Sequence, residues 1–426
     1  MYKLKIFNNI AENGLHILHE SNFVVTDENP DAIMLRSEIL KPESFNSELL
    51  CIARAGAGIN NIPIKEATKA GIVVFNTPGA NANAVKELVL CGMLLSSRGI
   101  LQGYNFLNSI STKDSNELNT EVESKKKEFK GFELQGKTLG IIGLGAIGSL
   151  VAQSAHNLGM NIIGFDPFIS IDSAWRLPKE VVKADSIEEL VGSADFISVH
   201  VPLVDDTKEM INENILKYFK KGSKLINLSR GPIINNDDVI NALKEGVIDR
   251  FVTDFPTQEL VNRSKKFGDV ILLPHLGAST SEAEINCAVM AANQTKDFIL
   301  NGNIINSVNF PRIRLSRSTD YRLVVINKNE PGLIGKIADC LASHQLNISD
   351  MVNKSMDEQL AYELTKAHIE NLDAHKKIAP FMETLNFGLV DKKSSGMCGP
   401  NPVKYHKGAV RAWEEAGYKI PECAKP

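Results

Sequence analysis

The stretch LGIIGLGAIGSLVAQSAHNLGMNIIGFDPF, residues 139–168, decides the fold of this chain. Gly143, Gly145 and Gly148 lie between an apolar run and a helix-like segment, and a second apolar run ends at Asp166. The spacing fits G-x-G-x-x-G, whose glycines allow a tight turn, close approach of the backbone to a pyrophosphate, and close packing of helix on strand. The stretch therefore predicts a dinucleotide site, with a purely structural glycine-rich turn as the alternative.

The residues beside these glycines favour NAD over NADP. The carboxylate of Asp166 can accept hydrogen bonds from ribose hydroxyls and would repel a 2′-phosphate, and no Arg or Lys follows at once to neutralise that phosphate. Ala146 and Ile147 open the predicted helix, where free N–H groups face the phosphates. We therefore expect NAD as the cofactor.

Bulk composition excludes several classes of protein. The 426 residues carry a formal net charge of -4, so no overall basic field favours nucleic acid or an acidic membrane surface. No apolar run is long enough for a membrane span, and no export signal is expected. The six cysteines are scattered, which predicts neither a metal site nor a disulfide framework and favours the cytoplasm.

Short apolar runs alternate with helical patterns along most of the chain, which predicts an α/β protein with two Rossmann-like, doubly wound parallel sheets. The predicted strands are residues 3–7, 32–35, 51–53, 73–75, 139–142, 161–165, 196–199, 224–228, 250–253 and 270–273. Helices are predicted at 83–98 and 281–300, a solvated helix or loop at 109–129, and a linker in the Asn- and Ser-containing residues 301–318.

Three polar residues follow later predicted strands and suit hydride transfer at a 2-hydroxy acid. Arg230 follows KLINLS, Glu259 lies beyond DRFVTD, and His275 follows VILLP. In an open α/β sheet such residues can converge beside a bound nicotinamide. His275 would take the hydroxyl proton, Glu259 would hold the imidazole, and Arg230 would grip the carboxylate. Taken singly, each also fits a structural role as a turn cap, a salt-bridge partner or a solvated carboxylate.

These motifs together resemble a known family. GLGAIG, FDP, VHVPL, NLSRGPIIN, TDFPTQEL and LPHLGAST resemble the D-isomer-specific 2-hydroxyacid dehydrogenases. With ARAGAGINNI and VVFNTPGANANAVKEL, residues 1–355 resemble the members that act on 3-phosphoglycerate. The resemblance implies NAD-dependent oxidation of 3-phospho-D-glycerate to 3-phosphohydroxypyruvate, at the start of L-serine biosynthesis. A reductase of glyoxylate, hydroxypyruvate or another 2-oxo acid is the near alternative, and a non-catalytic NAD-sensing interaction protein is a further one.

The resemblance also implies roles for individual residues. Arg230, Glu259 and His275 fall on the catalytic Arg, Glu and His; shifting TDFPTQEL by one residue would instead place Gln258 on the Glu, and Asp254 anchors the first alignment. Expected cofactor contacts are Gly143, Gly145, Ala146, Ile147, Gly148, Asp166, His200, Val201, Pro202, Thr207, Ser229, Asp254 and Gly277. Expected substrate contacts are Arg54, Ala55, Gly56, Ala57, Gly58, Arg36 and Asn76, with Arg54 favoured for the 3-phosphate, or else engaged in a surface salt bridge.

The resemblance further implies how the chain is divided. A discontinuous substrate-binding domain would comprise residues 1–103 and 275–304, the NAD-binding domain 104–274, and a linker 305–320. Such enzymes usually form homodimers or tetramers.

The last part of the chain departs from this pattern. Residues 321–355 resemble the first half of an ACT domain, a βαββαβ regulatory module, in which Asn329 and Asn347 would contact an amino-acid effector such as serine, or merely cap turns. From residue 356 the period becomes helical, and the tail to 426 resembles the end of TAXI-type solute receptors of TRAP transporters. We expect an atypical helical tail that does not complete an ACT domain; a chimera, a frameshift or a divergent extension are the open explanations.

Overall fold

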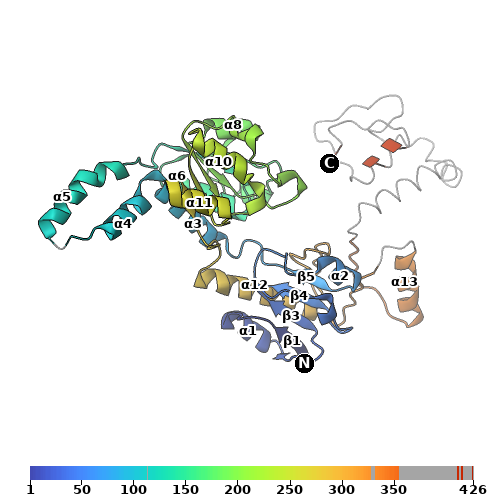
Figure 1. Cartoon of the computed structure of the whole chain (residues 1–426). Helices are drawn as coiled ribbons and strands as arrows, with labels where there is room; N and C mark the ends of the chain where they lie inside the picture. Colours follow the sequence, from blue (N-terminus) through green and yellow to red (C-terminus); the bar gives the residue numbers. More distant parts are fainter. Residues whose placement is uncertain (113, 328–331, 355–409, 412–413, 416–424, 426) are drawn as a thin grey trace. The chain divides into compact units, whose positions relative to one another are not determined.

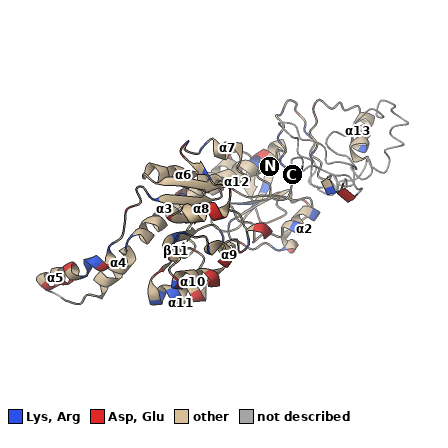
Figure 2. Ribbon diagram, turned by 90° about the horizontal axis from the view of Figure 1, so that it is seen from above, with Lys and Arg blue, Asp and Glu red and all other residues tan. Residues whose placement is uncertain are grey.

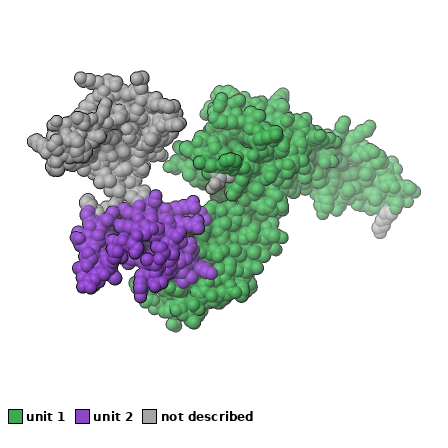
Figure 3. All heavy atoms as spheres, turned by 180° about the vertical axis from the view of Figure 1, so that it is seen from behind, with its two compact units in different colours: residues 1–62, 75–295 green, residues 63–74, 296–426 purple. Residues whose placement is uncertain are grey.

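The computed structural model describes residues 1–426 except 113, 328–331, 355–409, 412–413, 416–424 and 426. The chain separates into two compact units, residues 1–62 with 75–295 and residues 63–74 with 296–426 (Figure 3). The domain boundaries expected from the sequence stay predictions. Within the described residues, no helix combines the length and apolar character needed to cross a bilayer.

The larger unit contains a seven-stranded sheet in which all neighbouring strands are parallel (Figure 1). Its strands are β6 (Thr138–Ile142), β7 (Asn161–Phe165), β8 (Val182–Lys183), β9 (Phe196–Val199), β10 (Ser223–Asn227), β11 (Ile248–Thr253) and β12 (Val270–Leu272). The strand order is β12-β11-β10-β9-β6-β7-β8, so the chain reverses its direction of winding between β6 and β9. At such a reversal, the loops after the two strands diverge and leave a crevice at the C-terminal edge of the sheet.

A second, five-stranded sheet has the order β2-β1-β3-β4-β5. Its strands are β1 (Tyr2–Ile6), β2 (Phe23–Val25), β3 (Ala32–Leu35), β4 (Cys51–Arg54) and β5 (Val73–Phe75). Strand β3 is buried along its whole length and pairs in parallel with β1 and β4. Two parallel, doubly wound sheets confirm the α/β class predicted from the alternating pattern.

Helices connect and cover the strands. They are α1 (Glu12–His19), α2 (Ile64–Lys69), α3 (Ala82–Ser97), α4 (Ile100–Ser109), α5 (Ser115–Lys125), α6 (Ala146–Asn157), α7 (Ile171–Ala174), α8 (Ile187–Ser193), α9 (Glu213–Leu216), α10 (Asn236–Lys244), α11 (Gln258–Phe267), α12 (Ser281–Asn301) and α13 (Leu333–Ser343). Helix α3 packs on α6 and β10, and a Cβ atom at Gly92 would lie 3.0 Å from the Cγ1 atom of Val252. The glycine therefore lets α3 approach β11 closely.

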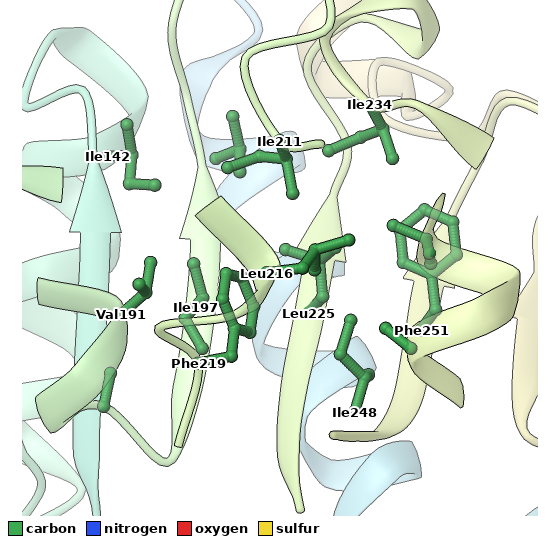
Figure 4. Packing of buried hydrophobic residues seen from close by; sticks show 14 of the residues in the cluster. Ile142, Val191, Ile197, Ile211, Leu216, Phe219, Leu225, Ile234, Ile248 and Phe251 are labelled. Atoms are coloured by element: carbon green, nitrogen blue, oxygen red, sulfur yellow. The ribbon is translucent and has the colours of Figure 1, made fainter. Parts of the chain in front are cut away.

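The seven-stranded sheet is held by an apolar core that strands and helices share. Ile197, Leu225 and Phe251 from β9, β10 and β11 meet Val191 from α8 and Leu216 from α9 (Figure 4). These strands read as nearly continuous apolar runs because helices cover both faces of a parallel sheet. Removing this surface from water is the main favourable contribution to folding.

The polar stretch 109–129 forms a solvated helix. Helix α5 has no buried residue, carries both acidic and basic residues (Figure 2), and begins where Asp114 accepts hydrogen bonds from the N–H groups of Asn116 and Glu117. The N-cap satisfies N–H groups that lack a partner in the helix. Helix α4, which precedes it, was not predicted, and it also has no buried residue.

In the smaller unit, residues after α12 bind the segment that contains α2. Asn309 accepts a hydrogen bond from the N–H of Val74 and donates two more, to the hydroxyl of Thr68 and the carbonyl of Ile72. Ile304 and Ile313 form an antiparallel bridge. Part of the predicted linker is thus hydrogen-bonded structure.

The ACT-like prediction for residues 321–355 is not confirmed. Helix α13 is present, but the described residues on either side of it, 321–327 and 344–354, form no strand. A strand needs a neighbour to take up its backbone hydrogen bonds, and none is found among the described residues. Asn347 is exposed, whereas Asn329 and nearly all of the predicted helical tail lie outside the described residues.

Replacing Phe251 with Ala tests the packing of the core. Phe251 is 1% exposed, so the change removes buried apolar surface and leaves a cavity. We expect the free energy of unfolding to fall by about 3–5 kcal/mol, as measured by urea unfolding followed by circular dichroism. Phe168→Ala, at a side chain that is 92% exposed, is the matched control and should change it by less than about 0.5 kcal/mol. Equal losses in the two variants would contradict the core position of Phe251.

Candidate active site

The glycine-rich turn joins β6 to α6 at the reversal of the seven-stranded sheet. Gly143 has φ +94°, and a Cβ atom there would lie 2.8 Å from the carbonyl carbon of His200, which follows β9. A Cβ atom at Gly148 would collide with the carbonyl of Gly143. A Cβ atom at Gly145, by contrast, would meet nothing within 4 Å. Two glycines therefore permit close packing, and the third leaves open space at the start of α6.

The start of α6 is suited to an anion. Ala146 and Ile147 are its first residues, and no acidic side chain lies in its first turn. Free N–H groups and the helix dipole attract negative charge there. The open space at Gly145 lies at this helix end, so the residues present fit a pyrophosphate.

Asp166 lies directly after β7, and both of its carboxylate oxygens accept hydrogen bonds from the backbone. Its Oδ2 atom accepts the N–H of Leu144 at 2.8 Å, and its Oδ1 atom accepts the N–H of Phe168 at 2.9 Å. A carboxylate has about four acceptor positions, so both oxygens can still accept a ribose hydroxyl. Asp166 therefore ties the glycine-rich turn to the end of β7, and its role as a ribose ligand stays a prediction.

Asp254 presents an acceptor without a partner. The side chain is 1% exposed, its Oδ2 atom accepts the N–H of Gly277 at 3.1 Å, and its Oδ1 atom has no hydrogen-bond partner among the described residues. Burial raises the pKa of Asp254, while the Gly277 N–H and the positive charges near it oppose the rise. A buried acceptor of this kind suits an amide donor, as in nicotinamide.

The residues after β9 are held by their own hydrogen bonds. His200 contacts the Oγ atom of Ser198 through Nε2 at 2.8 Å, and its buried Nδ1 atom has no partner among the described residues. Burial lowers the pKa of His200 to about 4, so the ring is neutral at pH 7. The hydroxyl of Thr207 donates to the carbonyl of Pro202 and accepts the N–H of Val204. Thr207 therefore shapes this loop, and Val201 lies within it.

Asn227 positions the turn that carries Arg230. The Nδ2 atom of Asn227 donates to the carbonyl of Arg230, and its Oδ1 atom accepts both the N–H and the hydroxyl of Ser229. Asn227 is 1% exposed, whereas the Arg230 side chain is exposed. The sequence-based prediction missed Asn227; its place as the last residue of a buried strand, directly before the turn, was the available signal.

His275 is exposed on a strained turn after β12. Its φ is +53°, and its N–H is directed at the carbonyls of Asp254 and Leu273. Its ring packs edge-on against Phe255, with 5.2 Å between ring centroids. A left-handed conformation is costly for a residue other than glycine, and such strain gathers at functional sites. The tertiary contacts thus fix the direction of the imidazole.

Glu259 lies in the first turn of α11, and its side chain is turned toward its own helix end. Its own N–H and the hydroxyl of Thr257 lower the pKa of this carboxyl. Among the described residues, no hydrogen bond or ion pair joins Glu259 to His275, and Gln258 instead donates to Asn262. The assignment of Glu259 to the imidazole stays a prediction.

The loop after β4 is folded over Arg54. The guanidinium of Arg54 donates from Nε to the carbonyl of Arg36 at 3.0 Å and from Nη1 to the carbonyl of Gly58 at 2.7 Å. A Cβ atom at Gly56 would lie 2.6 Å from that Nη1 atom. Asn76 donates to the carbonyl of Ala57, which joins this loop to the next one. The glycines of the loop are needed because the guanidinium occupies the space where side chains would point.

Arg36 follows β3 and is held by two asparagines that the sequence-based prediction missed. The Oδ1 atom of Asn8 accepts the N–H groups of Arg36, Ser37 and Glu38 at 2.8–3.3 Å. The Nδ2 atom of Asn61 donates to the carbonyl of Arg36. Asn8 stands after β1 with φ +68°, a conformation that asparagine tolerates better than most residues.

Three guanidinium groups share the site. A Cβ atom at Gly58 would lie 3.6 Å from the Nη2 atom of Arg230. Burial lowers the pKa of Arg54, and the charges of Arg230 and Arg36 lower it further. The charge of Arg230 also opposes the rise in the pKa of Asp254 that burial causes. The structure thus brings Arg36, Arg54, Arg230, Asp254 and His275 into one cluster of charged and titratable side chains.

Comparison with known proteins identifies the family. The NAD-binding domain of the D-isomer specific 2-hydroxyacid dehydrogenases matches residues 102–277. A D-3-phosphoglycerate dehydrogenase of Haemophilus influenzae is 32% identical over 377 residues, 82% of this chain and 87% of that protein. This chain is a D-isomer specific 2-hydroxyacid dehydrogenase family member. The predicted family, the α/β fold class and NAD as the cofactor are confirmed.

Two further members of the family show how far the likeness extends. The D-3-phosphoglycerate dehydrogenase of Synechocystis sp. is 36% identical over 328 residues, 73% of this chain. A solved NAD+-bound 3-phosphoglycerate dehydrogenase of Entamoeba histolytica is 29% identical with a TM-score of 0.58, over 72% of this chain and 99% of that one. The present chain spans 56%, 63% and 59% of the length of the Synechocystis, Methanocaldococcus jannaschii and Bacillus subtilis relatives.

Gly145→Ala tests the open space at the start of α6. The added Cβ atom meets no protein atom within 4 Å, so the fold should tolerate it. It would fill the space into which a pyrophosphate approaches, and we expect NAD to bind at least tenfold more weakly, as measured by isothermal titration calorimetry. Gly335→Ala, also without a neighbour within 4 Å, is the control. Unchanged NAD affinity in Gly145→Ala would contradict the placement of the phosphates.

The neutral state of His200 makes stability depend on pH. The unfolded chain binds a proton near pH 6.5 and the folded chain only near pH 4, so acidification favours unfolding across that interval. Between pH 7 and pH 5 this group should remove about 2 kcal/mol from the free energy of unfolding, measured in urea. In His200→Gln the loss over that interval should be smaller. His19 is exposed, so His19→Gln is the control and should lose as much stability between pH 7 and pH 5 as the wild type. An equal loss of stability in His200→Gln would contradict the neutral, buried state of His200.

Proposed function

We propose that this chain oxidises 3-phospho-D-glycerate to 3-phosphohydroxypyruvate with NAD, the first step of the phosphorylated route to L-serine. The observation that carries the proposal is the cluster of Arg36, Arg54 and Arg230 beside the turn of His275. The substrate carries a carboxylate and a phosphate, and guanidinium groups bind both with paired hydrogen bonds. The relatives named D-3-phosphoglycerate dehydrogenase support this choice of substrate.

Each cationic group has a distinct task in this proposal. Arg230 holds the carboxylate next to the reacting carbon, because its turn is rigidly held by Asn227 close to Asp254. Arg54 and Arg36 bind the phosphate at the other end of the three-carbon chain. The N–H groups of the loop at residues 55–58, whose glycines allow close backbone approach, would add contacts to the acid. A substrate held at both ends is aligned for reaction.

The chemical step needs one base and one hydride acceptor. The imidazole of His275 takes the proton of the C2 hydroxyl, and the C2–O bond becomes a carbonyl as hydride leaves C2. NAD, when bound, accepts that hydride. Asp254 would hold the carboxamide through its unpartnered Oδ1 atom. Glu259 would favour the protonated imidazole if α11 brings its carboxylate to the ring.

Partners, regulation and location belong to the same proposal. A homo-oligomer is supported by α4, whose Leu101, Tyr104 and Leu107 side chains are exposed on one helix. A serine effector site at Asn329 and Asn347 rests on the family resemblance alone. The cytoplasm is supported by Cys51, Cys91, Cys287 and Cys340, which are free thiols.

A panel of acids tests the proposed substrate. With NAD, kcat/KM for 3-phospho-D-glycerate should exceed that for D-glycerate and D-lactate by at least about a hundredfold, because two guanidinium groups would lose their ligand. His275→Asn should lower kcat by about 10²- to 10⁴-fold while NAD still binds, as measured by calorimetry. Equal turnover of the unphosphorylated acids would favour a 2-oxo acid reductase. NAD binding with no turnover of any acid would favour an NAD-sensing protein.

A further inference from the structure

The Arg36 side chain has a carboxylate partner inside the predicted substrate site. The Nη1 atom of Arg36 lies 2.6 Å from the Oε1 atom of Glu284, in the first turn of α12. The backbone of Arg36 is held by Asn8 and Asn61. Among the described residues, Glu284 is the acidic group paired with the Arg36 guanidinium. The direction of this side chain therefore depends on Glu284.

The Arg36–Glu284 pair lies close to two other positive charges, so it affects the charge of the predicted substrate site as well as the stability of α12. Burial is the largest cause of the lowered pKa of Arg54, and the positive charges of Arg230 and Arg36 lower it further, so both repel the Arg54 guanidinium. Glu284 offsets one of these three charges while no substrate is bound. An isolated surface ion pair contributes little to stability, and both side chains are more than a third exposed. The larger expected effect of the pair is on the affinity of Arg36 for anions.

We propose that Glu284 is a specificity-determining counter-ion of the phosphate subsite: it aims Arg36 at the acid and limits the positive charge offered to it. The inference rests on the proposed function. A phosphate that reaches Arg36 must share the guanidinium with this carboxylate or displace it, and both cost affinity. The subsite then binds the phosphate group of a small acid, and free phosphate, less tightly than an unpaired Arg36 would.

Glu284→Gln isolates the charge, because the amide oxygen can still accept a hydrogen bond from Arg36. We expect KM for 3-phospho-D-glycerate to fall about three- to tenfold, and the ratio of its kcat/KM to that of D-glycerate to rise by the same factor. Inorganic phosphate should bind about three- to tenfold more tightly, as measured by calorimetry. Glu284→Asp keeps the charge and should stay near wild type in all three quantities.

Glu282→Gln is the matched control. Glu282 lies in the same first turn of α12, is exposed, and has no ion pair among the described residues. It removes the same charge from the helix end without touching Arg36, so it should keep the wild-type ratio. An equal change in both variants would mean that only the helix end or the net charge matters, and would overturn the proposal.

The remaining outcomes are also decisive. An unchanged or raised KM in Glu284→Gln, together with unchanged phosphate binding, would overturn the role of Glu284. If the wild-type chain shows no preference for the phosphorylated acid, the proposed function fails. The phosphate titrations of the wild type and of Glu284→Gln then still decide whether Glu284 offsets Arg36, so the two failures are distinguishable.

Discussion

The close packing of the loop after β6 against the loop after β9 is the constraint on which the cofactor site depends. Gly143 adopts a left-handed conformation with no room for a side chain against the backbone of His200. That packing sets where α6 begins, and hence where its free N–H groups point. It also buries the imidazole of His200, whose proton affinity falls because the charged form is poorly solvated there. Asp166 then joins the turn to β7 through Leu144.

Repulsion between like charges governs the other half of the site. Three guanidinium groups gather where the five-stranded sheet supplies Arg36 and Arg54 and the loop after β10 supplies Arg230. Carbonyl oxygens of Arg36 and Gly58 hold Arg54 in place, and Glu284 pairs with Arg36. Such an arrangement costs free energy in the free protein, and an anionic ligand would offset that cost. The clustering of three positive charges is therefore an argument for an anionic ligand.

Most strands were predictable from the sequence, and two short edge strands were not. Strands β3, β5, β7 and β9 occupy the residues expected from their apolar runs, because a strand buried on both faces leaves an unbroken apolar pattern. The edge strands β2 and β8 were missed because they are short and mostly exposed, so no buried apolar run marks them. Helix α4 was missed between two stronger patterns. The ACT-like strands, predicted from a local resemblance, find no pairing partner among the described residues.

The sequence by itself determined the class of fold and the glycine-rich turn, because periodicity and glycine spacing are local properties. It also singled out Arg230 and His275 as candidate residues, because each follows a predicted strand. Only the tertiary structure decided that Asn8, Asn61 and Asn227 hold the arginine-bearing loops, and that Glu284 reaches Arg36 from a helix far along the chain. Asparagine and glutamate serve many surface roles, so no local pattern marks these residues. Their function arises from hydrogen bonds between segments that meet only when the sheets form.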